Sequence, residues 1–190
     1  MGAGLVGGLS SQTWYLLLLA AVAAERVAEL AVSRRNTRWS LANGGVESGR
    51  QHYPALVALH TALLLGCLAE VRLADRPFVP AVGWPMLALV AAAQAGRWWC
   101  VGTLGRQWNT RVIVVPGMPR VTTGPYRWLR HPNYVVVAVE GIALPMVHDA
   151  WLTALVFTVC NAALLGIRLR CEESALAGAP ELPARPSRPG

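Results

Sequence analysis

The sequence predicts an all-α integral membrane protein, a bundle of about five transmembrane helices that ends in a helical hairpin. Hydrophobic residues make up 54% of the 190 positions and charged residues only 14%. A soluble domain carries about 45–50% apolar and about 25% charged residues, so this composition argues against a soluble enzyme and against disorder. Five apolar runs separate loops that are alternately rich and poor in arginine, which is typical of a multipass membrane protein.

The first two runs cover residues 14–32 and 53–71. The first is interrupted by Glu25, Arg26 and Glu29. Because Glu25 and Glu29 are four residues apart, they share one helical face, and we expect them to pair with Arg26 or with an arginine of a loop. This interpretation makes the two acids structural.

The remaining runs cover residues 82–101, 134–147 and 151–167. The run 134–147 is about 21 Å long as a helix, which is too short to cross a bilayer core of ~30 Å untilted. The connection between the last two runs, at His148-Asp149, is very short. We therefore expect these two helices to form a tight antiparallel hairpin.

Arginine positions predict the topology. All 17 basic residues are arginine, and those outside the runs concentrate in the loops after the first and third runs and after the fifth. The positive-inside rule then places the N-terminus outside and these loops in the cytoplasm. The all-arginine basic content and abundant Ala and Val indicate a GC-rich bacterial genome, hence a bacterial cytoplasmic membrane. The net charge of +7 does not indicate a nucleic-acid partner, because the arginines flank apolar runs, where membrane lipids are the expected contact.

A polar segment lies directly before the fourth run, at residues 124–134 (GPYRWLRHPNY). An interfacial belt of aromatic residues and arginines accounts for Arg127 and Trp128. It does not account for His131 in front of Pro132. This segment is therefore a candidate functional site as well as a candidate interfacial one.

Two further features contain acids. Glu140 lies six residues into an apolar helix, where an acid faces either a polar site or an ion partner such as Arg97. Arg168 and Glu172 are one helical turn apart in the sequence RLRCEE. Acids near a helix C-terminus oppose the helix dipole, so Glu172 needs a ligand or a buried partner, although an interfacial salt bridge is also possible.

In this order, the features resemble the isoprenylcysteine carboxyl methyltransferase family of integral membrane methyltransferases. Residues 130–134 (RHPNY) fit the family's R-H-P-x-Y, residues 168–173 fit its R-x-x-x-E-E, and residues 124–126 fit its G-x-Y. The resemblance implies one membrane-embedded methyltransferase domain over residues 1–177, with its catalytic part at 104–176. The Pro- and Gly-rich residues 178–190 are expected to be a disordered tail.

The N-terminal half resembles a bacterial branch of this family. The matching pieces are Arg34-Arg35-Asn36, Gly44-Gly45-x-Glu47 and His52-Tyr53-Pro54. Members of this branch are associated with type III polyketide synthases and act on alkylpyrones or alkylresorcinols. In one departure from the family, Val136 stands where many members have a small residue.

The resemblance implies S-adenosylmethionine as the methyl donor, bound in a pocket that faces the cytoplasm. Side chains of the polar segment and Glu172 can hydrogen-bond or pack around such a donor, and the backbone of residues 118–121 lies where the family contacts the adenine. The implied cofactor-binding residues are Met118, Pro119, Arg120, Val121, Tyr126, His131, Pro132, Asn133, Tyr134 and Glu172. No metal ligand set is expected.

Arg168 is the implied catalytic residue, since a guanidinium can orient the acceptor's carboxylate, phenolate or enolate oxygen. Glu140 is an additional catalytic candidate. The acceptor is expected to be a lipophilic small molecule, because the site lies at the membrane. A membrane NADPH-dependent reductase and a non-enzymatic transporter or scaffold are alternatives. Four scattered histidines exclude a membrane di-iron oxygenase.

Overall fold

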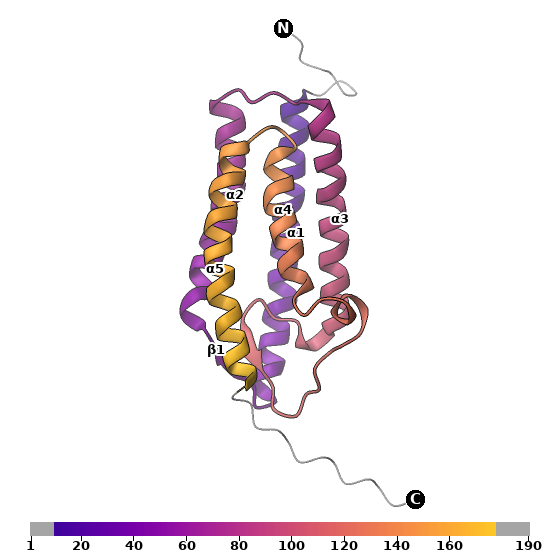
Figure 1. The fold of residues 1–190 in the computed structure, drawn as a ribbon, viewed down its shortest axis with the longest axis vertical. Coiled ribbons are helices and arrows are strands. Elements are labelled where there is room, and N and C mark those ends of the chain that lie inside the picture. The colour runs from indigo at the N-terminus through magenta and orange to yellow at the C-terminus, as the bar shows by residue number, and fades with distance from the viewer. Residues whose placement is uncertain (1–9, 178–190) are drawn as a thin grey trace, which may run out of the picture.

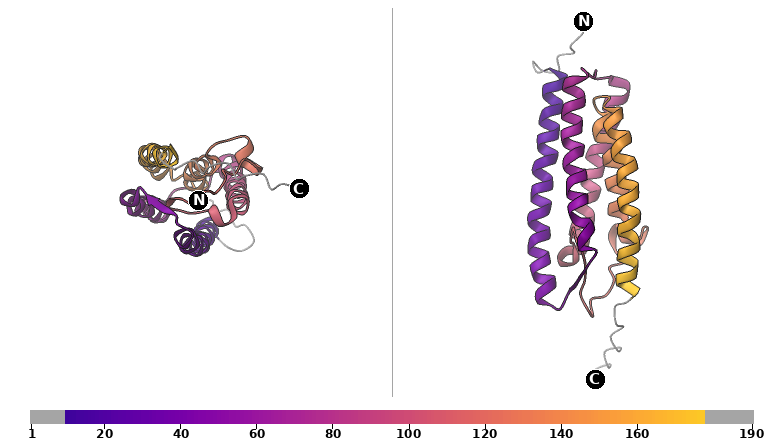
Figure 2. Two further views of the ribbon diagram at one scale, coloured as in Figure 1. Left: turned by 90° about the horizontal axis from the view of Figure 1, so that it is seen from below. Right: turned by 90° about the vertical axis from the view of Figure 1, so that its left-hand side faces the viewer.

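The computed structural model describes residues 10–177 as a bundle of five long helices that stand side by side (Figures 1 and 2). This confirms that each of the five apolar runs is a helix. The tail predicted at residues 178–190 lies outside the described residues, and side chains are described up to Glu172. The helices are α1 (Ser11–Ala42), α2 (Tyr53–Leu73), α3 (Pro80–Leu104), α4 (Pro132–Met146) and α5 (Trp151–Ala177).

Helix α1 is longer at its C-terminal end than the apolar run 14–32 that predicted it. In the additional turns Ser33, Asn36 and Ser40 are buried, while the arginines between them are not. The buried positions recur every three or four residues, so this part of α1 is amphipathic with a polar buried face. Hydropathy alone cannot detect such a face.

Two segments of the described chain are long and apolar enough to cross a membrane: Arg50–Leu73, which contains α2, and Trp151–Glu172 in α5. Helix α4 is apolar but has only 15 residues. Helices α1 and α3 carry charged and polar residues in their interiors, which lowers their hydropathy. Five helices are therefore present, while five membrane crossings stay a prediction.

Short elements that the sequence did not predict lie at one end of the bundle. Strands β1 (Val46–Ser48) and β2 (Val112–Val114) pair antiparallel, with Glu47 opposite Ile113. We call this the loop end; it contains residues 43–52 and 105–131 and the last turns of α5 (Figure 1). Its single-turn helices are η1 (Arg50–His52), η2 (Gly105–Gln107) and η3 (Gly124–Arg127).

Helix α4 packs against α3 and α5 and runs antiparallel to α5, as expected for the hairpin (Figure 1). Gly141 makes this packing possible, because a Cβ there would overlap the Phe157 ring. Leu144 of α4 is fully buried and lies in the apolar core near the opposite end of the bundle from the loop end.

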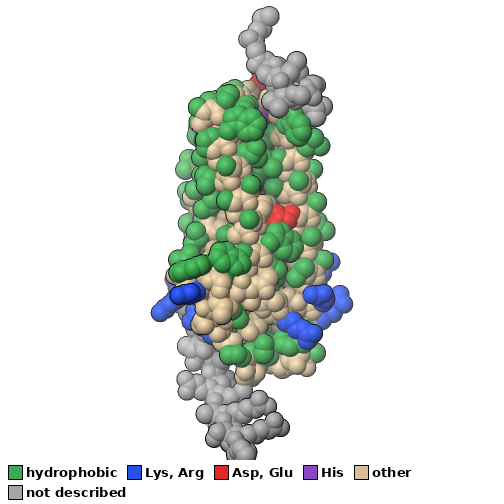
Figure 3. All heavy atoms as spheres, turned by 90° about the vertical axis from the view of Figure 1, so that its right-hand side faces the viewer, with side chains coloured by type: hydrophobic (Ala, Val, Ile, Leu, Met, Phe, Trp, Pro, Cys, Tyr) green, Lys and Arg blue, Asp and Glu red, His purple; other side chains and the backbone are tan. Residues whose placement is uncertain are grey.

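The outer surface is apolar along most of the bundle. On α5, exposed Leu152, Leu155, Val156 and Val159 recur at helical spacing, as expected for a lipid-facing surface. Figure 3 shows hydrophobic side chains over the upper part of one face and basic side chains gathered toward its lower end. The loop end is therefore the polar end of the bundle.

Candidate active site

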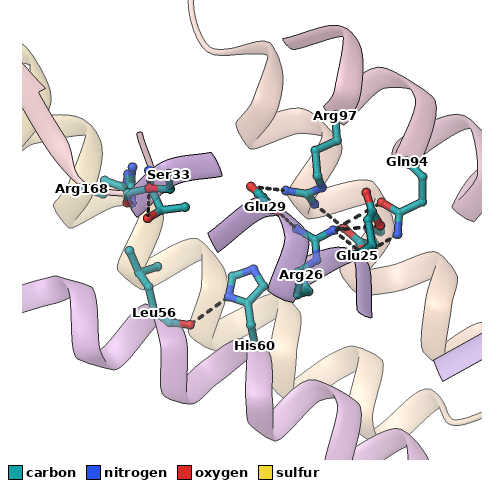
Figure 4. A network of polar contacts seen from close by, with 11 residues as sticks. Glu25, Arg26, Glu29, Ser33, Leu56, His60, Gln94, Arg97 and Arg168 are labelled. Carbon is teal, nitrogen blue, oxygen red and sulfur yellow. Dashed lines mark hydrogen bonds and ion pairs between the residues drawn. The ribbon is translucent and has the colours of Figure 1, made fainter. Parts of the chain in front are cut away.

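A buried ion cluster holds Glu140. The Arg26 guanidinium donates to both Glu140 carboxylate oxygens, at 2.9 and 2.8 Å, and Arg97 also donates to Glu140. Arg26 donates to Glu29 at 2.7 Å, which confirms the pairing expected within α1. Figure 4 shows Arg26 and Glu29 of α1 and Arg97 of α3 pointing toward one another. Arg97, the ion partner considered for Glu140, is therefore one of the two partners found, and Arg26 is the other.

The two members from α3 and α4 are almost completely shielded from solvent. Glu140 is 4% exposed and Arg97 is 2% exposed. Both Glu140 oxygens already accept hydrogen bonds from guanidinium groups. The structure does not bring Glu140 into hydrogen-bonding contact with Arg168, the other residue expected to be catalytic.

A second cluster, at the loop end, joins α4 to α5 through the Tyr134 hydroxyl. This hydroxyl donates to Glu172 Oε2 at 2.5 Å and accepts from Arg168 Nε at 2.9 Å. The Arg168 guanidinium carbon also lies 5.7 Å from the Tyr134 ring centre, a cation–π distance. Arg168 and Glu172, predicted to share a helical face, are thus bridged by one tyrosine.

His131 completes this group, which we call the Tyr134 cluster: His131, Tyr134, Arg168 and Glu172. The His131 and Tyr134 rings are stacked, with centroids 5.2 Å apart and planes 4° apart. His131 Nδ1 lies 3.9 Å from Glu172 Oε1, an ion-pair distance when the imidazole is protonated. All four members were predicted site residues.

The backbone of Thr110 fixes the position of Arg168. Arg168 Nη1 donates to the Thr110 carbonyl at 2.7 Å. The Thr110 N–H donates to Ser33 Oγ at 3.0 Å, and the two hydroxyls are 2.8 Å apart, which ties the loop to α1. Thr110 and Ser33 were not predicted, since a main-chain carbonyl partner has no signature in a sequence.

Tyr126 lies in the same region, in the turn η3. It packs against a small buried group formed by Cys100, Val101 and Trp108. Burial raises the pKa of the Tyr126 phenol, and the nearby Cys100 and Glu172 act in the same direction. Tyr126 is therefore a neutral hydroxyl at physiological pH.

Pro132 and Asn133 form the first turn of α4. Pro132 is buried at the first helical position, where its missing N–H costs nothing. The Asn133 Oδ1 atom is buried and has no hydrogen-bond partner in the described chain. An acceptor in this state calls for a donor from a ligand or from water.

Residues 118–121 lie farther out, in a largely exposed turn. The Met118 N–H donates to the Val115 carbonyl at 3.3 Å, and the Pro119 carbonyl accepts from Gln107 at 3.3 Å. Within the described residues, no side chain of Met118, Pro119, Arg120 or Val121 makes a hydrogen bond or ion pair with the Tyr134 cluster. Their predicted role through the backbone stays a prediction.

Val136, which departs from the family pattern, points toward α3. A Cβ on Gly96 would lie 3.2 Å from Val136 Cγ2. Glycine at this position of α3 therefore makes room for the larger valine. The departure is accommodated between α3 and α4.

The hydrogen-bonding groups and rings around Tyr134 fit S-adenosylmethionine. The α-ammonium group and the two ribose hydroxyls of this molecule need hydrogen-bond acceptors. Glu172 and the unpaired Asn133 Oδ1 are acceptors in the same region. The stacked His131 and Tyr134 rings provide a flat surface next to them. Tyr126 adds a neutral hydroxyl.

A narrow cleft, lined in part by Arg168, lies between the β1–η1 segment, β2 and α5. The sequence indicated no cleft here. It is lined by Glu47, Ser48, Gly49, His52, Tyr53, Leu56, Thr110, Arg111, Val112, Arg168 and Cys171. Glu47 pairs with Arg111 at 3.1 Å, and the Arg111 guanidinium lies 4.9 Å from the Tyr53 ring centre.

Comparison with known proteins adds independent information. Residues 86–178 match the model of the isoprenylcysteine carboxyl methyltransferase (ICMT) family. The chain is 38% identical over 163 residues to the uncharacterized protein YpbQ of Bacillus subtilis, which covers 85% of this chain and 96% of that protein. It is 25% identical over 163 residues to an uncharacterized protein of Haemophilus influenzae, covering 84% and 93% of the two chains.

Proposed function

Because the chain belongs to the isoprenylcysteine carboxyl methyltransferase family of membrane proteins, we propose that it transfers a methyl group from S-adenosylmethionine to an oxygen of a lipophilic acceptor. Family membership favours this activity over the reductase and transporter alternatives. The observation that carries the site assignment is the Tyr134 hydroxyl bridging Arg168 and Glu172.

In this proposal Glu172, Asn133 and Tyr126 hold the donor by hydrogen bonds. The rings of His131 and Tyr134 pack against it, and the main chain of residues 118–121 covers its adenine. When bound, S-adenosylmethionine supplies an electrophilic methyl group on a sulfonium centre. The acids near the C-terminus of α5 are then explained by a cationic ligand, which offsets their unfavourable place in the helix dipole.

Arg168 is the proposed catalytic residue. Its guanidinium is fixed by Tyr134 on one side and by the Thr110 carbonyl on the other. A fixed guanidinium favours the ionised acceptor oxygen and orients it. Methyl transfer is an in-line displacement, so positioning of this oxygen and exclusion of water supply much of the rate. Glu140 instead has a structural role in this proposal, since its two oxygens are engaged with arginines.

The acceptor is proposed to be an amphiphile such as an alkylpyrone, an alkylresorcinol or a prenylcysteine. Its polar head reaches Arg168 at the loop end, and its apolar tail extends along the apolar part of the bundle. The chain is proposed to lie in a bacterial cytoplasmic membrane with the loop end in the cytoplasm. The basic side chains near that end and a water-soluble donor both support this orientation.

The test is transfer of an isotopically labelled methyl group. Purified protein in detergent is mixed with labelled S-adenosylmethionine and alkylresorcinol or alkylpyrone, and the label in the organic phase is measured. The proposal expects label in a product whose new methyl is bound to oxygen, and none with Arg168→Ala. Label on carbon or nitrogen, or none with a panel that includes a prenylcysteine and a bacterial lipid extract, would contradict it.

A further inference from the structure

The direction of the Arg168 guanidinium depends on two hydrogen bonds. Its Nε donates to the Tyr134 hydroxyl at 2.9 Å, and its Nη1 donates to the Thr110 carbonyl at 2.7 Å. No described residue accepts from its Nη2, which is the guanidinium nitrogen left for a ligand. Because a guanidinium is planar, two fixed hydrogen bonds determine where the third nitrogen points. The position of the Thr110 carbonyl therefore helps to set the direction of Nη2.

A buried serine of α1 holds Thr110. The Thr110 N–H donates to Ser33 Oγ at 3.0 Å, and the hydroxyl oxygens of the two residues are 2.8 Å apart. Ser33 is 3% exposed, so bulk water does not compete for these contacts. Figure 4 shows Ser33 and Arg168 beside each other, where both reach this loop residue. The two contacts restrain both the main chain and the side chain of Thr110.

The residues before Thr110 are held by the same face of α1. Asn36, which is 2% exposed, donates to two main-chain carbonyls of the loop. These are the carbonyls of Gly105 and Trp108, at 2.9 and 2.8 Å. A buried side-chain amide that satisfies two carbonyls gives the loop one defined path. The loop therefore takes its shape from α1, although in the sequence it follows α3.

A second restraint follows the Thr110 carbonyl along the chain. Arg111 pairs with Glu47 of β1 at 3.1 Å. Val112 then begins β2, where it lies opposite Ser48. The Thr110 carbonyl is therefore placed between a link to α1 on its N-terminal side and the β1–β2 pair on its C-terminal side.

We propose that Ser33 is a positioning residue for methyl transfer: through Thr110 it holds the Arg168 guanidinium in the direction that orients the acceptor oxygen. The inference rests on the proposed function. Ser33 contacts neither substrate in this account and acts only through Arg168. The proposal also gives a role to the part of the chain before the family match. Ser33 precedes residues 86–178, whereas Thr110 and Arg168 lie within them.

The experiment is a double-mutant cycle between Ser33 and Arg168. The readout is the single-turnover rate of labelled methyl transfer at saturating S-adenosylmethionine, with whichever of alkylresorcinol, alkylpyrone or prenylcysteine takes the label. Ser33→Ala removes the acceptor of the Thr110 N–H and leaves the charge of Arg168 in place. We expect the rate to fall about tenfold, because a displaced guanidinium no longer holds the acceptor oxygen in line. The affinity for S-adenosylhomocysteine should stay within about twofold of wild type, which also shows that the variant is folded.

The second arm of the cycle and a control separate positioning from general stability. In an Arg168→Lys background, Ser33→Ala should lower the rate by less than about twofold further, because residues that act as one unit are not additive. Ser40→Ala is the matched control: Ser40 is 1% exposed on the same face of α1 and accepts from the Asn109 side chain. It should lower the thermal midpoint about as much as Ser33→Ala, since each change removes a buried hydroxyl. Its rate should stay within about twofold of wild type, because Ser40 has no hydrogen bond to Thr110.

Three results would overturn the positioning role: full turnover in Ser33→Ala, equal rate losses in Ser33→Ala and Ser40→Ala, or an undiminished loss in the Arg168→Lys background. If Ser33→Ala does not bind S-adenosylhomocysteine while wild type does, Thr110→Val carries the same test. This variant removes only the hydroxyl contact to Ser33 and keeps the main-chain one. A wild-type chain that binds no S-adenosylhomocysteine, or that labels no acceptor, would instead overturn the proposed function itself.

Discussion

The Tyr134 hydroxyl is the atom on which Arg168 and Glu172 of α5 converge. It donates to Glu172 and accepts from Arg168, so neither charge is left without a partner. A neutral hydroxyl between a carboxylate and a guanidinium keeps the two charges apart while satisfying one hydrogen bond of each. Each charged group thereby retains capacity for a ligand of its own.

Arg168→Lys tests the acceptor side of this arrangement. Lysine keeps the charge but loses the planar fork that binds Tyr134 and Thr110 together, so the acceptor oxygen would no longer be held in line. We expect turnover to fall at least about tenfold, a loss of ~1.4 kcal/mol in transition-state stabilisation. The affinity for S-adenosylhomocysteine should stay within about twofold of wild type, a change below the ~1.4 kcal/mol that a tenfold difference represents. Single-turnover rates and donor titrations measure the two quantities, and parallel losses in both would refute a separate acceptor role.

Glu172→Gln tests the donor side. Loss of a charge-assisted hydrogen bond should weaken donor binding by about 1–3 kcal/mol. An interfacial salt bridge without a ligand would be worth at most about 1 kcal/mol of stability and would leave donor binding unchanged. Calorimetric titration with S-adenosylhomocysteine separates these outcomes.

At the residue scale the sequence was informative wherever a side chain itself carries the chemistry. Spacing and motif resemblance together identified Tyr134, Arg168 and Glu172, which the structure brings together. They could not identify the Thr110 carbonyl, because every residue has one. They could not identify Ser33 either, since its contact with Thr110 depends on tertiary packing.

At the scale of helices, the buried ion cluster joins α1, α3 and α4. Arg26 and Arg97 face three acids, Glu25, Glu29 and Glu140, so the acids outnumber the arginines by one. Glu25 is the least engaged: its Oε2 is 4.0 Å from Arg26, and its Oε1 is buried without a partner. The cluster therefore tolerates loss of Glu25 better than loss of Glu140.

This asymmetry gives a pair of variants with opposite expectations. Glu140→Gln leaves Arg97 buried and poorly compensated, which should cost about 3–5 kcal/mol and lower the thermal midpoint strongly. Glu25→Gln, the matched control, removes the least engaged of the three acids and should change stability by less than about 1 kcal/mol. Thermal unfolding in detergent measures both. An unchanged midpoint for Glu140→Gln, together with lost turnover, would return Glu140 to a catalytic role.

Helix positions were predictable from apolar runs, and helix ends were not. The run 14–32 underestimated the length of α1, because the buried residues of its last turns are polar. Ser33, Asn36 and Ser40 are hydrogen-bonded in the interior and do not register as apolar positions. Asn36, for example, donates to the carbonyls of Gly105 and Trp108. Such partners come from the loop after α3, and no local pattern reveals them.

For the whole molecule, the separation of an arginine-rich loop end from an apolar bundle predicts the orientation in a membrane. The β1–β2 pair was not predicted, because three-residue strands carry too little alternation to be recognised. It nevertheless closes the loop end by joining residues that are more than sixty positions apart. The five helices thus followed from the apolar runs, while the shape of the loop end required the structure.

Orientation can be tested with single cysteines and a membrane-impermeant label in intact cells. Asn43→Cys and Arg120→Cys are exposed positions at the loop end and should be protected. Ala74→Cys is exposed at the opposite end and should react. The parent chain gives the background from its native cysteines, of which Cys160 is exposed. Labelling at 120 but not at 74 would reverse the orientation.

The most direct test of the account is binding of S-adenosylhomocysteine to the folded protein in detergent, measured by calorimetry and by thermal shift. A ligand that binds only the folded state stabilises it by about 2.7 kcal/mol at a hundredfold excess over Kd. We predict saturable binding with one site per chain, weakened in Glu172→Gln and retained in Arg168→Lys. Neither heat of binding nor thermal shift at millimolar ligand, in a sample shown to be folded, would contradict the assignment of the Tyr134 cluster as a donor site.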